Sequence, residues 1–135
     1  RYAVVHASKT YQTGSGTNPQ THTHTDLVLM DLESNAQIPL ASVTDQQANA
    51  QRFSEDGKKL AYTIRDYNTG ETQLHIYDIA AGTIQTEVIK GRGAHVIAWH
   101  GDNMLIREGT TPDSDVLLYL GPQKDKPKET TISLN

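Results

Sequence analysis

Short runs of β-favouring residues recur along the whole chain, and no segment carries the apolar spacing of an amphipathic helix. The only helical candidate, 43–51, is polar and lacks an apolar stripe. Turn-forming pairs such as Asp56-Gly57 and Ala81-Gly82 separate the runs. Many short strands with frequent turns predict an all-β sandwich, barrel or propeller. The strand-like runs are 1–8, 25–32, 59–64, 73–79, 84–89, 96–99, 104–107, 116–120 and 130–134.

A repeat with a period in the forties favours one of these architectures. Phe53 and Trp99 lie 46 positions apart, each ahead of a turn and a further strand. Asp31 and Asp78 end equivalent strands 47 positions apart. Four strands per unit at this spacing are typical of propeller blades. The alternative is a sandwich whose strands merely look alike, and the matched aromatic and aspartate positions make it the weaker interpretation.

The repeat predicts a single partial propeller domain over residues 1–135, with about three blades of four antiparallel strands. Residues 49–90 form a complete blade, 94–135 a nearly complete blade, and 1–43 a blade without its innermost strand. Three blades do not close a ring, and open blades leave strand edges unpaired. We expect the missing blades to come from flanking sequence of a longer chain, with a homodimer that closes a six-bladed ring as the alternative.

Composition excludes several classes of function. Cysteine is absent, which excludes disulfides, thiolate metal sites and a thiol nucleophile. The net charge of −4 disfavours a nucleic-acid binder, and no apolar run approaches the roughly 18 residues of a membrane-spanning helix. Apolar residues make up only 36% of the chain while threonine occurs 16 times, which fits short strands with thin apolar layers.

The segment 53–63 resembles the repeat of TolB-like six-bladed propellers, in which an aromatic residue, Ser-Pro-Asp-Gly-Lys and a strand follow in order. The runs 25–32 and 74–79 resemble the third strand of the same blades. Two features depart from the pattern: Glu55 replaces the usual proline, and the blade that contains Trp99 lacks the Asp-Gly turn. The family includes periplasmic proteins, sensor domains and propeller domains of enzymes.

The resemblance implies a non-catalytic propeller module for protein or peptide interaction or ligand sensing, located in the periplasm or elsewhere outside the bacterial cytoplasm. No nucleophile elbow, phosphate-binding loop or dinucleotide motif occurs, so we expect no enzymatic activity. The alternative is a propeller domain of a larger oligopeptidase-like or polysaccharide-lyase-like enzyme, whose catalytic part is absent or metal-dependent. No cofactor, nucleic-acid partner or membrane insertion is expected.

The longest stretch without a clear pattern, 11–25, is predicted to be a polar loop. It carries His22 and His24, which would share one side of an extended chain. Two neutral imidazoles can ligate zinc or copper, but no third ligand is evident. A solvated loop is therefore the favoured interpretation, and no metal site is predicted.

The remaining candidate binding residues lie in connections between strands. The resemblance places these connections on the face where partners of TolB-like propellers bind, so they would form a charged rim that contacts a peptide. Surface charge around turns is the plainer alternative. The candidates are Gln47, Asn49, Arg65, Asp66, Tyr67, Arg92, His95 and Arg107.

Overall fold

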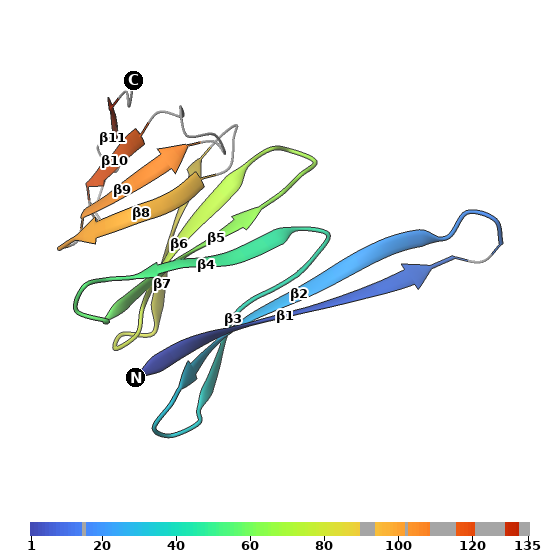
Figure 1. Ribbon diagram of the computed structural model, residues 1–135, viewed down its shortest axis with the longest axis horizontal. Coiled ribbons are helices and arrows are strands. Elements are labelled where there is room, and N and C mark those ends of the chain that lie inside the picture. Colours follow the sequence, from blue (N-terminus) through green and yellow to red (C-terminus); the bar gives the residue numbers. More distant parts are fainter. Residues whose placement is uncertain (15, 90–93, 102, 109–115, 121–128, 133–135) are drawn as a thin grey trace. The chain divides into compact units, whose positions relative to one another are not determined.

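A computed structural model describes residues 1–14, 16–89, 94–101, 103–108, 116–120 and 129–132. In these residues the chain forms strands β1 to β11 and no helix, which confirms the all-β prediction (Figure 1). The described part therefore contains no helix that could cross a membrane. The strands form three sheets, and the chain divides into two compact units, Arg1–Asn49 and Ala50–Asn135, which are described separately.

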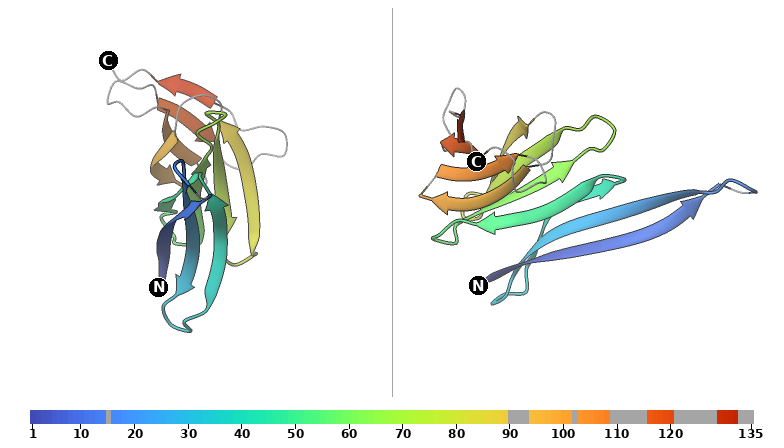
Figure 2. Two further views of the ribbon diagram at one scale, coloured as in Figure 1. Left: turned by 90° about the vertical axis from the view of Figure 1, so that its right-hand side faces the viewer. Right: turned by 45° about the horizontal axis from the view of Figure 1, so that its top comes forward.

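The first sheet contains three strands in the order β1-β2-β3. Its main feature is a long hairpin, in which β1 pairs with β2 from Tyr2 opposite Asp31 to Thr13 opposite Gln20 (Figure 2). The third strand covers only the part of β2 from His24 to Met30. The bounds are β1 Tyr2–Thr13, β2 Gln20–Asp31 and β3 Gln37–Thr44.

The predicted loop over 11–25 is wrong, because most of it belongs to β1 and β2. Threonine is β-branched and suits extended backbone, and hydroxyls pair across the hairpin. Ser8 Oγ lies 3.1 Å from Thr25 Oγ1, and Thr10 Oγ1 lies 3.4 Å from Thr23 Oγ1. Strand pairing therefore continues through a segment whose sequence lacks the alternation of apolar and polar residues that predicts a strand.

The second and third sheets contain four strands each, in the orders β4-β5-β6-β7 and β8-β9-β10-β11. Each strand pairs with its neighbour in sequence, so both sheets are simple meanders. The helical candidate 43–51 is the end of β3 and the beginning of β4. The bounds are β4 Gln47–Phe53, β5 Lys59–Arg65, β6 Thr72–Asp78, β7 Thr83–Ile89, β8 Ala94–His100, β9 Asn103–Glu108, β10 Val116–Leu120 and β11 Glu129–Ile132.

An apolar cluster joins the second sheet to the third. A register shift between Val96 and Ala98 brings Val96 and Trp99 to the same side of β8, although they are three positions apart. Their partners Ile106 and Met104 share a side of β9 in the ordinary alternation. The cluster consists of Ala61, Leu74 and Ile76 from the second sheet with Val96, Trp99, Met104 and Ile106 from the third.

Hydrogen bonds also connect the first strands of these two sheets. The Nε1–H of Trp99 donates to the carbonyl of Arg52 at 3.3 Å. The Nε–H of Arg52 donates to the carbonyl of Val96 at 3.3 Å, and the Val96 N–H donates to Gln51 Oε1 at 3.2 Å. Strands β4 and β8 therefore lie side by side, about one repeat apart in sequence.

Local side-chain bonds fix several turns. Asp31 Oδ1 accepts the Glu33 N–H at 2.9 Å, and Asp78 Oδ1 accepts the Ala81 N–H at 3.1 Å. These two aspartates thus cap the ends of β2 and β6 through local backbone hydrogen bonds. In the β4–β5 turn, Gly57 has a φ of 72°, a left-handed conformation that glycine adopts without strain.

Candidate functional site

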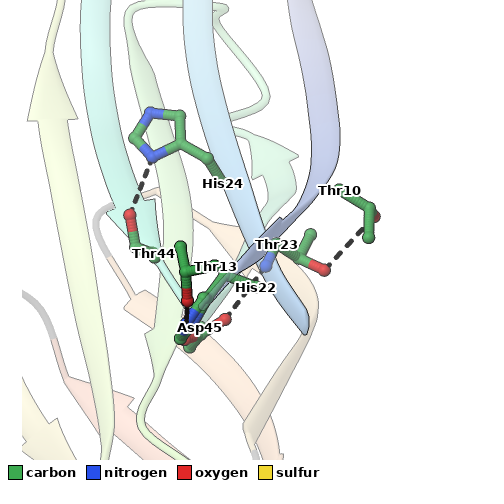
Figure 3. A network of polar contacts seen from close by, with 7 residues as sticks. All are labelled: Thr10, Thr13, His22, Thr23, His24, Thr44 and Asp45. Carbon is green, nitrogen blue, oxygen red and sulfur yellow. Dashed lines mark hydrogen bonds and ion pairs between the residues drawn. The ribbon is translucent and has the colours of Figure 1, made fainter. Parts of the chain in front are cut away.

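His22 and His24 lie on one side of β2, as their spacing predicts, in a network of polar side chains (Figure 3). His22 contacts Asp45, in the connection after β3, and Thr13, at the end of β1. The Nδ1 atom is 2.5 Å from Asp45 Oδ2, and Nε2 is 3.0 Å from Thr13 Oγ1. One imidazole therefore joins three segments of the first sheet.

The backbone around Asp45 supports this arrangement. Asp45 has a φ of 57°, which Asp tolerates better than most residues, and its N–H donates to the Thr23 carbonyl at 2.8 Å. Its Oδ1 accepts the Thr23 N–H at 2.9 Å. The hydrogen bond from His22 is the main cause that lowers the pKa of Asp45, and the Thr23 N–H is the next. The carboxylate is therefore held in its charged form.

The charge on Asp45 fixes the tautomer of a neutral His22. A carboxylate only accepts hydrogen bonds, so Nδ1 carries the proton and Nε2 accepts from the Thr13 hydroxyl. This order of carboxylate, imidazole and hydroxyl also occurs in hydrolases. Here Thr13 and Asp45 are exposed, so water competes for each group. We interpret the hydrogen bonds among Asp45, His22 and Thr13 as cross-strand contacts that fix the end of the hairpin.

His24 has its own set of partners. Its Nδ1 lies 2.9 Å from Thr44 Oγ1, and its Nε2 lies 3.0 Å from Ser42 Oγ and 3.2 Å from Asp26 Oδ1. The pKa of Asp26 is lowered chiefly by its hydrogen bond with Ser42, and His24 adds to the effect. The ring thus bridges β2 and β3.

These bonds bear directly on metal binding. All four ring nitrogens of His22 and His24 have side-chain partners, so a metal would have to displace them. Among the described residues, no three His, Asp or Glu side chains are grouped closely enough to hold a metal ion. The partners Thr13, Asp45 and Thr44 were not predicted, because up to 23 positions separate them from the histidines they contact.

A second polar cluster lies in the other unit, where β5 ends and β6 begins. Arg65 pairs with Thr72 in the sheet, and the guanidinium lies 5.7 Å from the centre of the Tyr67 ring. Thr72 is 1% exposed and Tyr67 is 62% exposed. Arg65 Nε and Thr72 Oγ1 are buried and have no hydrogen-bond partner in the described part of the chain. Thr72 was not predicted as a site residue, since nothing in the sequence around it marks a buried hydroxyl.

The other predicted residues are distributed as follows. Asp66 Oδ1 accepts the Asn68 N–H at 2.8 Å, which shapes the turn that holds Tyr67. Gln47 and Asn49 are in β4, and His95 is exposed in β8. Arg92 lies outside the described residues, as does the side chain of Arg107 in β9. The structure therefore groups Arg65, Asp66 and Tyr67, and separately groups His22 and His24.

No protein-family model, curated protein or solved structure matches the chain. The resemblance to TolB-like propellers therefore rests on the sequence motifs alone.

Proposed function

We propose that the chain is a non-catalytic β-propeller module of the TolB-like kind, acting outside the bacterial cytoplasm, and that it binds a protein or peptide through the loops at the end of its strands. The second and third sheets are taken as neighbouring blades. The compartment follows from the sequence resemblance, and the mode of binding from the composition of the loops.

One observation carries this proposal: β4 and β8, the first strands of two successive four-stranded meanders, are adjacent. Three hydrogen bonds among Gln51, Arg52, Val96 and Trp99 join them. The apolar cluster then fills the space between the two sheet faces. Neighbouring propeller blades place their first strands side by side around a central axis, so both features are those expected of blades.

The β5–β6 turn is the best-described candidate for the binding loop. Tyr67 presents an exposed aromatic ring beside the Arg65 guanidinium. Tyrosine and arginine are enriched among residues that dominate protein-protein binding energies, because each combines apolar contact area with hydrogen bonding. Asp66 fixes the backbone of the turn between them, because its Oδ1 accepts the Asn68 N–H at 2.8 Å.

A panned peptide library tests the function. Selected peptides, titrated into isotopically labelled protein, should shift amide resonances between Arg65 and Thr72. Tyr67→Ala should weaken binding about tenfold or more, the loss expected for a binding hot spot. Ile84→Ala is the matched control, since Ile84 is a 49% exposed apolar residue on β7. Failure to select any peptide, or shifts confined to other regions, would refute the proposal.

The source of the remaining blades is a separate question. A second copy of the chain would give a six-bladed ring from two sets of three sheets. Light scattering of the purified chain distinguishes the cases, because ring closure by two copies requires the mass of a dimer. A monomer at all concentrations rejects that closure and leaves flanking sequence as the proposed source.

A further inference from the structure

Two buried polar groups at one end of the second sheet lack partners among the residues that the structure describes. Thr72 Oγ1 and Arg65 Nε are both inaccessible to solvent and form no hydrogen bond within the described residues. Buried polar atoms are nearly always paired in native proteins. An unpaired buried group loses its bonds to water without replacement. Two such groups on adjacent strands therefore leave hydrogen-bonding capacity that an added acceptor would satisfy.

The sheet register shows which side these groups occupy. Thr72 is directly opposite Arg65, and two positions along β6 Leu74 is opposite Thr63. Alternate residues of a strand share a face, so Arg65 and Thr72 lie on the same face as Leu74, which belongs to the apolar cluster against the third sheet. Thr63 on this face already accepts from Gln51 Nε2 at 3.1 Å. The two groups thus lie at the end of the apolar cluster between the second and third sheets, beside the β5–β6 turn.

The chemistry of the two groups specifies the acceptor. Arg65 Nε–H is a donor, and the Thr72 hydroxyl can donate as well. The guanidinium forms no ion pair with any described residue, although its Nε is buried. The adjacent carboxylate, that of Asp66, accepts from Asn68 within its own turn. A partly buried cation beside a free hydroxyl is best completed by an anion with two acceptor oxygens.

We infer that Arg65 and Thr72 bind a carboxylate group, which reaches these two covered atoms when the side chains over them move aside. One carboxylate oxygen accepts from Arg65 Nε–H, and an oxygen of the same group accepts from Thr72 Oγ–H. The Tyr67 ring, which lies over the guanidinium and is largely exposed, contacts whatever carries the carboxylate. The inference rests on the proposed function and gives its ligand a chemistry: a peptide that inserts either its C-terminal carboxylate or an Asp or Glu side chain.

The first test uses acetate as the probe and acetamide as its uncharged analogue. Acetate should shift the Arg65 Nε–Hε resonance and the Thr72 amide resonance in a saturable manner, whereas acetamide should not. Arg65→Lys keeps the charge but removes Nε–H, and Thr72→Val removes the hydroxyl at similar volume. Each variant should weaken acetate binding about tenfold, as expected for a hydrogen bond to a charged group. Lys58→Gln, which removes an exposed charge in the β4–β5 turn, is the control.

The stability of Thr72→Val separates a ligand from a buried water. Because the hydroxyl has no partner among the described residues, its loss should leave the thermal midpoint of the ligand-free protein unchanged or raised. A lowered midpoint would mean that the hydroxyl is already satisfied, which overturns the inference. Equal shifts with acetamide, or full acetate binding by both variants, would overturn it as well.

Peptides distinguish the two sources of the carboxylate. A selected peptide is compared with its C-terminal amide and with variants in which each Asp or Glu is replaced by Asn or Gln. Loss of binding in either arm supports the carboxylate and identifies its source. Peptides that bind equally well without any carboxylate would refute the inference and leave the proposed function intact. Acetate binding without any peptide binding would refute the proposed function instead.

Discussion

Replacing Trp99 with alanine should destabilise the protein more than replacing any exposed residue does. Trp99 is 6% exposed and packs between the second and third sheets. A buried tryptophan removes 150–250 Å² from water, worth about 4–6 kcal/mol at about 25 cal/mol per Å². Measured large-to-small substitutions of this kind cost about 3–5 kcal/mol. We therefore expect Trp99→Ala to lower the free energy of unfolding by about 4 kcal/mol.

Trp99→Phe divides this effect into two parts. Phenylalanine keeps most of the apolar ring but cannot donate to the Arg52 carbonyl, which accepts from Trp99 Nε1–H at 3.3 Å. The lost hydrogen bond and the smaller ring together should cost about 1–2 kcal/mol. The variant is also useful because a domain of ordinary stability, about 5–15 kcal/mol, is only marginally folded after the loss expected for Trp99→Ala.

Urea unfolding followed by far-ultraviolet circular dichroism measures both variants, with Val88→Ala as the control. Val88 is 50% exposed on β7, so its truncation should change stability by no more than about 0.5 kcal/mol. Trp99 is the only tryptophan in the sequence, so its emission in the wild type should be that of an indole shielded from water. A cost for Trp99→Ala no larger than that of Val88→Ala would refute the packing of the two sheets.

Four further predictions concern individual residues. The pKa of Asp45 is lowered in the folded protein, so its ionised carboxylate stabilises the fold fully above about pH 4, and this stabilisation is lost as the pH falls through the folded-state pKa. In Asp45→Asn, the urea midpoint should therefore fall less steeply with decreasing pH than in the wild type. A decline of unchanged steepness would contradict this. Burial raises the pKa of Tyr62 to about 12, so alkaline ultraviolet titration should contain a late step that Tyr62→Phe removes. Gly57→Ala should cost about 1–2 kcal/mol in urea unfolding, because φ is 72° there; a neutral effect would show a relaxed turn. Finally, hydrolysis of p-nitrophenyl acetate should be the same for His22→Ala and the wild type, and a selective loss in the variant would identify a catalytic array.

The sequence predicted strand content well where apolar residues and turn pairs alternate. The predicted strand after Asp56-Gly57 and the predicted strands before and after Ala81-Gly82 correspond to strands in the structure. The long hairpin was missed because its outer half is polar apart from Tyr11, so its pairing depends on β-branched residues and cross-strand hydroxyls rather than on an apolar pattern. The shift in register at Val96, which turns Trp99 inward, has no marker in the local sequence.

The candidate sites were predicted in part for a similar reason. His22 and Arg65 stand out by residue type, and each lies in a polar cluster. Their partners Asp45 and Thr72 become neighbours only through strand pairing, which sequence spacing does not specify. Whether a buried hydroxyl finds a partner depends on the packing of a neighbouring strand, so the unpaired state of Thr72 could be recognised only in three dimensions.

Nuclear Overhauser contacts between β4 and β8 show whether the first strands of the second and third sheets are adjacent. We expect contacts from the Trp99 indole N–H to backbone protons of Arg52, and from the Val96 amide to the Gln51 side chain. A well-dispersed β-sheet spectrum that lacks both contacts would contradict the adjacent first strands, and with them the stacked sheets on which the proposed function depends.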